Sequence, residues 1–353
     1  MSLDDWRSRI NELDNQILTL LNQRAEAALH IGDLKRRQDA PSYVPEREAE
    51  VVRRLTTRSG GPLPAGAVQD IWREILSACR ALEQPLSVTY LGPPATFTHQ
   101  AALQRFGTAV AYRPARSIAE AFDEVERGRA QYGVVPVENT TEGAVNVTLD
   151  RLIDSETVIC GELYLEIGQY LLSRATDLSE IKRVCSHPQG LAQCRRWLAE
   201  HLPNVPTEET LSTSAAAELA ATDATVAAIA SELAGRLYGV PALRERIEDH
   251  RHNATRFLVL GRQPTSPSGR DKTSILFAMR NEPGSLYRIL EPLARLGINL
   301  TKIESRPAKQ RPWEYVMFVD FEGHRETTQV GSALDELSKR TLFLKILGSY
   351  PTG

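Results

Sequence analysis

Four short polar groups interrupt the middle of the chain, and each adjoins an apolar run. They occupy residues 138–141, 186–193, 212–214 and 253–257. Each group alone is also explained by a helix cap, since Ser, Thr and Asn are favoured there. Hydroxyl and amide side chains, however, hold carboxylates well, and a hydroxyl next to a cation can give a proton to a leaving oxygen. In an open α/β sheet, ligands bind beyond the carboxyl ends of the strands, so the four groups together predict one polar cleft.

Two cations lie within the apolar face of the helix predicted for the N-terminal segment. Burial of an unpaired cation is costly, so Arg24 and Lys35 require an anion that is buried with them, either a carboxylate of the same domain or a bound ligand. At 1.5 Å per residue the two lie about 16 Å apart, a span that one small molecule can bridge. Arg7 lies about 25 Å beyond Arg24, so it can reach such a ligand only from an antiparallel neighbour. The apolar face consists of Trp6, Ile10, Leu13, Ile17, Leu20, Ala28 and Ile31.

The composition narrows the class of protein. At 353 residues the chain exceeds what one hydrophobic core organises, so we expect two or three domains. Its 42 Lys and Arg residues against 45 Asp and Glu residues leave no positive excess to attract nucleic acid. The sequence lacks an apolar run of the roughly 20 residues that span a bilayer, and its first ten residues lack the apolar core of a signal peptide. We therefore expect a cytoplasmic protein without a nucleic-acid or membrane partner.

Metal and cofactor motifs are missing from the sequence. The four cysteines are scattered and form no C-x-x-C pair, and His250 and His252 have no Cys or carboxylate cluster beside them. No G-x-G-x-x-G and no P-loop motif occurs. We expect neither a metal nor a cofactor.

The periodicity of the chain changes twice. The first segment is helical, with breaks at PSYVPERE and SGGPLPAG, and predicts helices over about 5–37, 45–58 and 68–83. From Val88 onward, short apolar runs alternate with helices, which predicts a mostly parallel α/β sheet. A Pro- and Ser-rich linker at 263–272 then precedes a strand-helix-strand-strand-helix-strand module, the α+β ferredoxin-like unit. The predicted domains are 1–86, 87–264 and 265–353.

The helical segment resembles the all-helical chorismate mutases, a family of intertwined dimers, over nearly all of residues 4–83. Those enzymes rearrange chorismate to prephenate without a nucleophile, by holding a compact dicarboxylate and donating to the ether oxygen that gains charge. The matching stretches are Arg7-x-x-Ile10-x-x-Leu13-Asp14, Gln23-Arg24, Ile31-Gly32-x-x-Lys35, Pro45-Glu46-Arg47-Glu48 and Ile75 to Glu83. By this resemblance Arg7 of a second copy, Arg24 and Arg47 hold carboxylates, Lys35 donates to the ether oxygen, and Glu48 accepts from the ring hydroxyl.

Two positions depart from the best-known mutase pattern. Val44 stands where some relatives have Asp, which leaves Glu48 alone to receive the hydroxyl. Glu83 stands where many have Gln as the second donor to the ether oxygen. Because an ionised Glu cannot donate, our hypothesis is that Glu83 works in its protonated form. The alternative is that Glu83 is an exposed residue of the last helical turn.

The polar groups of the middle segment resemble prephenate dehydratase. The matching motifs are GPxxxxxxxAA, VVPxENTxxG, SHPQxxxQC, STSxAA and xTRF, in order, over about residues 87–262. The resemblance implies two α/β subdomains around a cleft, similar to periplasmic binding proteins, and conversion of prephenate to phenylpyruvate with loss of CO2 and the ring hydroxyl. It makes Thr255 the donor to the leaving hydroxyl. Asn139, Thr140, Ser186, Gln193 and Thr213 then position the substrate, Arg256 pairs with a carboxylate, and Glu138 is structural.

The C-terminal module resembles the ACT domains of this family. ESRP (Glu304, Ser305, Arg306 and Pro307) and PGSL resemble their phenylalanine-binding motifs, with Gly284, Ser285 and Leu286 where the family has GAL. The resemblance implies L-phenylalanine as inhibitor. The plain alternative is a turn glycine and a surface Glu-Arg pair.

The whole chain thus resembles the bifunctional chorismate mutase/prephenate dehydratases with an ACT domain. Two other interpretations stay open, namely a dehydratase whose helical segment only dimerises and a non-catalytic amino-acid sensor.

Overall fold

The computed structural model describes residues 1–38, 43–250, 252–280, 282–307 and 315–353. The chain forms two compact units, which are described separately below. The first unit comprises residues 1–87 together with 105–111, and the second comprises 88–104 together with 112–353.

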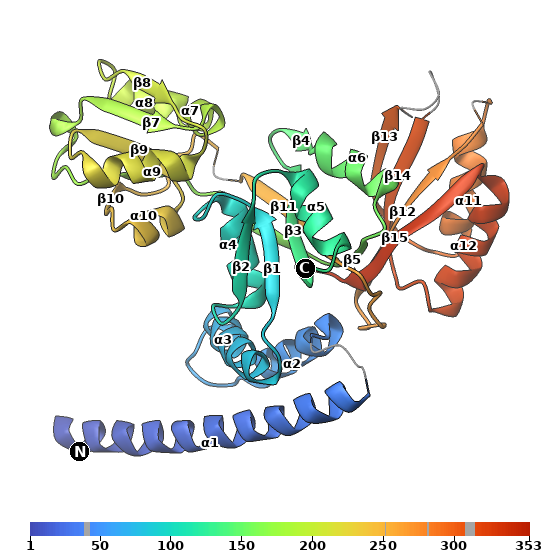
Figure 1. Cartoon of the computed structure of the whole chain (residues 1–353), viewed down its shortest axis with the longest axis horizontal. Coiled ribbons are helices and arrows are strands. Elements are labelled where there is room, and N and C mark those ends of the chain that lie inside the picture. The colour runs from blue at the N-terminus through green and yellow to red at the C-terminus, as the bar shows by residue number, and fades with distance from the viewer. Residues whose placement is uncertain (39–42, 251, 281, 308–314) are drawn as a thin grey trace. The chain divides into compact units, whose positions relative to one another are not determined.

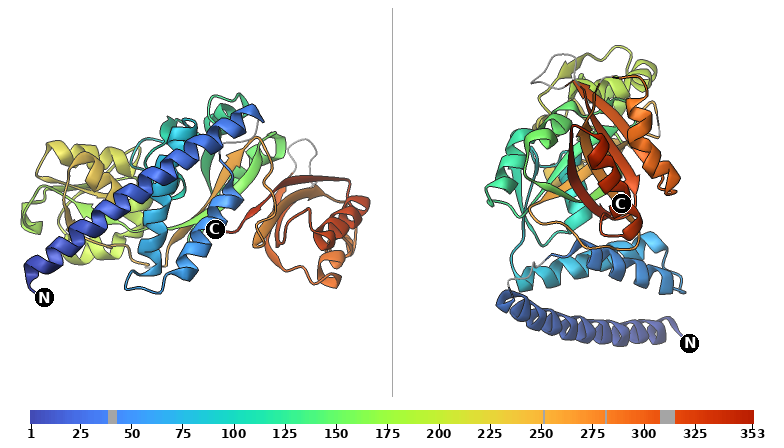
Figure 2. Two further views of the ribbon diagram at one scale, coloured as in Figure 1. Left: turned by 90° about the horizontal axis from the view of Figure 1, so that it is seen from below. Right: turned by 90° about the vertical axis from the view of Figure 1, so that its right-hand side faces the viewer.

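The described residues of the first unit form three helices. They are α1 (Leu3–Arg37), α2 (Pro45–Arg58) and α3 (Ala65–Glu83). α2 has the predicted bounds, whereas α1 begins earlier than predicted because Ser2 and Asp5 cap its first turn reciprocally. α1 runs as one uninterrupted helix (Figure 2).

The apolar face of α1 is exposed over its N-terminal half. Trp6, Ile10 and Ile17 each keep more than half of their surface accessible to solvent. The buried residues of α1 are Ala28 and Gly32, in its C-terminal half. At Gly32 the helix comes close to α3, because a Cβ there would lie 3.1 Å from the Cα of Glu83. Only the second half of α1 is therefore packed within the described part of this unit.

Within the described residues, the second unit forms three sheets (Figure 1). The first has the strand order β2-β1-β3-β11-β5, with β4 beside β3. Its strands are β1 (Ser87–Leu91), β2 (Ala111–Ala115), β3 (Tyr132–Asn139), β4 (Gly143–Ala144), β5 (Val158–Glu166) and β11 (Ala254–Gly261), and its helices are α4 (Phe97–Phe106), α5 (Ile118–Glu126) and α6 (Asn146–Asp154).

The second sheet is built from the chain between β5 and β11, in the order β10-β6-β9-β7-β8. Its strands are β6 (Tyr170–Leu172), β7 (Arg183–Ser186), β8 (Thr207–Glu209), β9 (Val226–Ala230) and β10 (Ala242–Arg244). The accompanying helices are the short 3-10 turn η1 (Leu178–Glu180), α7 (Pro188–Gln193), α8 (Arg195–His201), α9 (Thr213–Thr222) and α10 (Glu232–Tyr238).

Both sheets are mixed, so the prediction of a mostly parallel sheet needs correction. β1 pairs with β3 in parallel, as do β7 and β9, but β11 lies antiparallel to β3 and to β5. The chain leaves the first sheet after β5, builds the second sheet and returns along β11. It therefore enters the first sheet in the opposite direction, which a pattern of alternating strands and helices does not reveal.

The C-terminal part of the second unit is a four-stranded antiparallel sheet with the order β13-β14-β12-β15. Its elements are β12 (Asp271–Ala278), α11 (Ser285–Arg295), β13 (Leu300–Pro307), β14 (Tyr315–Glu322), α12 (Thr328–Arg340) and β15 (Phe343–Pro351). The last two residues of the predicted linker, Asp271 and Lys272, belong to β12 and are buried.

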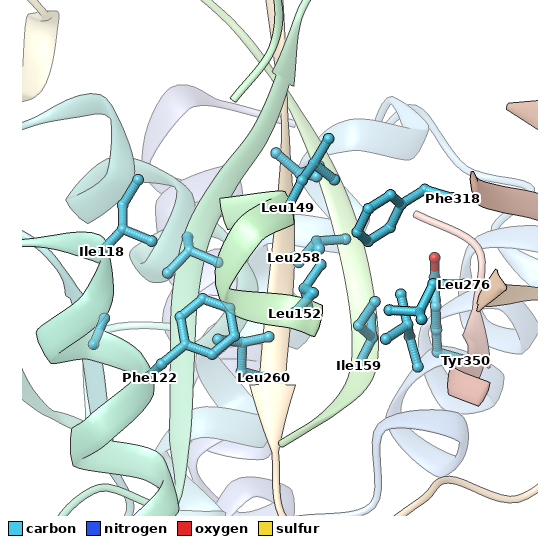
Figure 3. Close-up of a cluster of buried hydrophobic side chains, with 14 of the residues drawn as sticks. Ile118, Phe122, Leu149, Leu152, Ile159, Leu258, Leu260, Leu276, Phe318 and Tyr350 are labelled. Atoms are coloured by element: carbon cyan, nitrogen blue, oxygen red, sulfur yellow. The ribbon is translucent and has the colours of Figure 1, made fainter. Parts of the chain in front are cut away.

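The C-terminal sheet is covered on both faces. α11 and α12 lie side by side on one face, where Ile289, Leu293 and Leu337 pack against the sheet. On the other face, one buried cluster joins this sheet to β5, β11 and α6 of the first sheet (Figure 3). It includes Leu258 and Ile159 from the first sheet and Leu276, Phe318 and Tyr350 from the C-terminal sheet.

No helix among the described residues combines the length and the apolar character of a bilayer span. Within the same residues, no three His, Cys, Asp or Glu side chains are grouped as metal ligands.

Candidate active sites

The helical unit forms an open cavity of about 460 Å³. α1 contributes Arg24 and Lys35 to its wall, α2 contributes Arg47 and Glu48, and α3 contributes its last residue, Glu83. Three separate helices thus bring together five residues that the sequence singled out.

The wall of this cavity carries more positive than negative charge. Its cations outnumber its carboxylates, and apolar side chains such as Leu76 fill the space between them. The Arg24 guanidinium lies over the Trp72 ring, with its Cζ 5.9 Å from the ring centroid. Such a surplus of cations suits a small molecule with more than one carboxylate. The cations are Arg24, Lys35, Arg47, Arg54 and Arg80, and the carboxylates are Glu48 and Glu83.

Lys35 and Glu83 contact each other directly in the cavity wall. Lys35 Nζ donates to Glu83 Oε2 over 3.1 Å, and the Glu83 side chain is only 12% exposed. The alternative that Glu83 is an exposed last-turn residue is therefore wrong. Glu83 thus accepts a hydrogen bond from Lys35, so a donor role requires that it gain a proton.

Arg80 is a cavity residue that sequence reasoning missed. Its side chain is 4% exposed, donates to Glu48 and, over 2.6 Å, to the carbonyl oxygen of Phe106, and lies over the Tyr43 ring. Arg80 lies three residues before Glu83, a spacing that puts both on one face of a helix. This spacing could have identified Arg80 as a cavity residue.

Arg7 lies outside this cavity. Its side chain is 67% exposed and pairs with Asp4 in the first turns of α1. This placement agrees with the distance estimate, by which Arg7 cannot reach a ligand held by Arg24 and Lys35 of its own chain.

Asn139 and Thr255 form the centre of the second candidate site. They are register partners, at the end of β3 and the start of β11. The Asn139 amide oxygen accepts from the backbone N–H groups of Thr141 and Glu142, which fixes the amide orientation. Its nitrogen donates to Thr255 Oγ1 and to Asn253 Oδ1, each over 2.8 Å. Thr255 Oγ1 is thus an acceptor in this bond, which leaves its hydrogen available for another acceptor.

Thr140 holds the two strands together at this point. Its hydroxyl donates to the His252 carbonyl oxygen and accepts from the Ala254 N–H. The Thr140 hydroxyl thus has a backbone acceptor and a backbone donor as partners.

Ser186 and Thr213 lie together in the second sheet. Ser186, at the end of β7, is fully buried and donates to the Ile229 carbonyl oxygen. Thr213 begins α9, and both side chains lie against Gly190, where a Cβ would come within 2.5 Å of Ser186 Oγ and 3.5 Å of Thr213 Cγ2. Gln193 ends α7 and accepts from Gln169 over 2.9 Å. Ser186 ends β7 and Thr213 follows β8, whereas Gln193 ends a helix. These residues belong to the second sheet and its helices, and Asn139 and Thr255 belong to the first sheet.

Arg256 does not join the Asn139 and Thr255 group. Side chains alternate along a strand, so Arg256 points to the opposite face of β11 from Thr255. There it is buried and donates to Glu162, Asp320 and Tyr350. This placement argues against the sequence-based expectation that Arg256 pairs with a substrate carboxylate. Glu138 also lies on that side, where Lys302 Nζ is 2.7 Å from its Oε2.

The two motifs of the C-terminal module lie on different elements. Gly284 precedes α11 with φ +77°, a conformation that favours glycine, and Ser285 and Leu286 begin the helix. Glu304, Ser305 and Arg306 lie on the edge strand β13. Ser305 is exposed, whereas Arg306 pairs with Asp150 of α6 over 2.9 Å, so Arg306 is not the plain surface residue of the alternative interpretation.

Comparison with known proteins assigns a family to each part of the chain. The family models for chorismate mutase type II, prephenate dehydratase and the ACT domain match residues 6–84, 88–265 and 273–339. The bifunctional chorismate mutase/prephenate dehydratase of Aquifex aeolicus is 48% identical, over 99% of this chain and 98% of its own.

Solved structures resemble the second unit. A prephenate dehydratase from Arthrobacter aurescens, in complex with L-Phe, is 35% identical with a TM-score of 0.69, over 75% of this chain and 90% of its own. GqqA, described as a quorum-quenching acylase, is 30% identical with the same TM-score, over 76% of this chain and 98% of its own.

The chain combines a helical cavity rich in cations with a two-sheet domain that carries a polar Thr-Asn pair. Together with the three family matches, these features define a mutase and a dehydratase in one chain, followed by an ACT domain. The chain belongs to the family of bifunctional chorismate mutase/prephenate dehydratases.

Proposed function

We propose that this chain catalyses two consecutive steps of phenylalanine biosynthesis. The helical unit rearranges chorismate to prephenate, and the two-sheet domain removes CO2 and the ring hydroxyl of prephenate to give phenylpyruvate. L-phenylalanine binds the ACT domain and inhibits the second step. The observation that carries the proposal is the Asn139–Thr255 hydrogen bond, because it leaves the Thr255 proton available at the start of β11.

The mutase step uses the surplus of cations in the helical cavity. Arg24, Arg47 and Arg7 of a second copy hold the two carboxylates of chorismate in the compact conformer, which lowers the entropic part of the barrier. Lys35 leaves Glu83 and donates to the ether oxygen as the C–O bond breaks. Glu48, which Arg80 holds in place, accepts from the ring hydroxyl.

The helical unit is a dimer in this proposal. The exposed apolar face of α1 supports it, since Trp6, Ile10 and Ile17 gain cover only from another molecule or segment. A dimer also brings Arg7 of one copy to the cavity of the other.

Aromatisation of the ring drives the loss of CO2 in the dehydratase step. The step needs one proton, because the ring hydroxyl departs as water. Thr255 donates this proton, and the Asn139 amide stabilises the charge that develops on Thr255 Oγ1. Asn139, Thr140, Ser186, Gln193 and Thr213 position the substrate between the two sheets, as in the binding-protein-like cleft expected from the sequence. A shared fold does not fix this chemistry, as the acylase among the structural relatives illustrates, so the assignment depends on these residues.

The direct test supplies chorismate in one assay and prephenate in another, and it measures prephenate and phenylpyruvate separately. From chorismate we expect prephenate first and then phenylpyruvate. Phenylpyruvate from prephenate but not from chorismate would identify a dehydratase with a non-catalytic helical segment. No turnover of either substrate would favour an amino-acid sensor.

Glu83→Gln should flatten the pH dependence of the mutase step. The hypothesis that Glu83 donates in its protonated form predicts a wild-type mutase rate that falls as pH rises. Gln keeps a donor N–H at every pH. Chorismate consumption measured across pH tests this, with the dehydratase rate on prephenate as the internal control. An unchanged mutase profile in the variant would refute the hypothesis.

L-phenylalanine should lower the dehydratase rate and leave the mutase rate unchanged. The strand order β15-β12-β14-β13 supports a ferredoxin-like ACT domain, in which the loop at Gly284 and the strand at Glu304 form the amino-acid site. By linkage, a prephenate analogue weakens the binding of L-phenylalanine by the same factor by which L-phenylalanine weakens the binding of the analogue. Dehydratase rates in increasing L-phenylalanine, with D-phenylalanine as control, provide the measurement. A rate that both enantiomers leave unchanged contradicts the proposal.

A further inference from the structure

The residues next to the catalytic pair in sequence point to the ACT domain. Arg256 follows Thr255 on β11 and Glu138 precedes Asn139 on β3, and the two are themselves register partners. Because side chains alternate along strands, both lie on the face away from the catalytic pair. Leu258, the next residue on that face of β11, belongs to the buried cluster that joins the first sheet to the C-terminal sheet of the ACT domain (Figure 3).

Arg256 is held by carboxylates from both domains. Its Nη1 donates to Asp320 of β14 over 2.6 Å, and its Nε donates to Glu162 of β5 over 2.7 Å. Its Nη2 donates to the Tyr350 hydroxyl over 3.1 Å. All three guanidinium nitrogens thus have partners, and two of these partners belong to the ACT domain.

The buried charges of this network balance. Lys272 of β12 donates to both carboxylate oxygens of Glu162, so two cations face the two carboxylates of Glu162 and Asp320. Burial, together with Asp320, raises the pKa of Tyr350 well above its ordinary value, so Tyr350 is a neutral phenol. A buried network in which every charge has a partner keeps one geometry, because any displacement leaves a charge unpaired.

A second ion pair crosses from the ACT domain to β3. Lys302 Nζ of β13 lies 2.7 Å from Glu138 Oε2. Both β11 and β3 are therefore held from the ACT side, at the residue adjacent to Thr255 and at the residue adjacent to Asn139. The register between β3 and β11 also shifts directly after Arg256. Such an irregularity weakens the backbone ladder at this point and leaves room for side chains to set the strand position.

We propose that Arg256 and Glu138 are positioning residues for the dehydratase reaction, and that the ACT domain fixes them through Asp320 and Lys302. This inference rests on the dehydratase activity proposed above. It makes the ACT domain part of the scaffold that aims the Thr255 hydroxyl.

The same contacts give an effector a physical route to the catalytic pair. β13 carries both Lys302 and the motif residues Glu304 and Arg306. Arg306 in turn pairs with Asp150 of α6. A ligand that moves β13 therefore acts on Glu138 through Lys302, and through it on β3.

The test uses the full-length chain with three variants. Arg256→Met/Asp320→Leu removes one cation and one anion together, which leaves Glu162 paired with Lys272 and keeps the buried charges balanced. Lys302→Met removes the second pair, whose Glu138 partner is partly exposed. Lys345→Met is the matched control, because Lys345 is also an ACT cation that contacts the dehydratase domain, at the carbonyl oxygens of Leu152, Ile153 and Ser155.

We expect the first two variants to lower the dehydratase kcat by about tenfold to a hundredfold, with KM and the mutase rate unchanged, since small misplacements of a catalytic group cost this much. Both should also respond less to L-phenylalanine. Lys345→Met should keep the wild-type kcat even if its Tm falls. Equal kcat values in all three variants, or losses that follow Tm alone, would overturn the proposal. A wild-type chain without dehydratase activity would instead refute the proposed function itself.

Discussion

Thr255→Ala abolishes most dehydratase turnover and leaves the mutase rate unchanged. A positioned general acid contributes about a hundredfold or more to such a step, so the loss in kcat should be at least of that order. KM for prephenate should change little, because the other polar residues still bind the substrate. The hydroxyl is available for this role because its oxygen already accepts from the Asn139 amide.

Thr255→Ser provides the matched control. It keeps the hydroxyl and should retain most of the turnover, whereas loss of side-chain packing alone would affect both variants. Prephenate consumption and chorismate consumption are measured on the same preparations. Equal loss of both activities in Thr255→Ala would refute the assignment.

Lys35→Met removes mutase activity and spares the dehydratase. Removal of one donor to a developing oxyanion typically costs about a hundredfold to a thousandfold, and Lys35 is also the partner that faces Glu83. The variant keeps the length of the side chain, so the helical unit should stay folded.

Arg37→Gln is the control for Lys35→Met. Arg37 lies in the last turn of α1 too but is exposed, so its loss should leave chorismate turnover unchanged. A Lys35→Met variant that turns over chorismate as fast as Arg37→Gln would show that the cavity is not the mutase site.

The residues of both sites were predictable wherever local pattern determined their position. Helical periodicity placed Arg24 and Lys35 on one face of α1, and both line the cavity. Their distance along the helix from Arg7 excluded Arg7 from the same cavity. The ends of apolar runs likewise located Asn139 and Thr255. They are paired because β3 and β11 are neighbours, and the two residues lie 116 positions apart along the chain, so spacing did not reveal this pairing.

The roles that depend on distant partners were not predictable. Arg256 stands next to Thr255 and looked like a substrate ligand, but its partners Glu162 and Asp320 lie 94 and 64 residues away along the chain. Lys272 was assigned to a linker because Pro, Ser and Gly precede it, whereas its pairing with Glu162 makes it part of a buried strand. Arg80 was passed over for the same reason, since its partner Glu48 is on another helix.

The most direct test of two separate active sites in one chain is a complementation assay that starts from chorismate. Lys35→Met and Thr255→Ala are each incubated with chorismate alone and then mixed in equal amounts, and prephenate and phenylpyruvate are measured over time. Thr255→Ala alone should accumulate prephenate, Lys35→Met alone should leave chorismate unconsumed, and the mixture should form phenylpyruvate. A mixture that forms no phenylpyruvate while Thr255→Ala still releases prephenate would contradict the account.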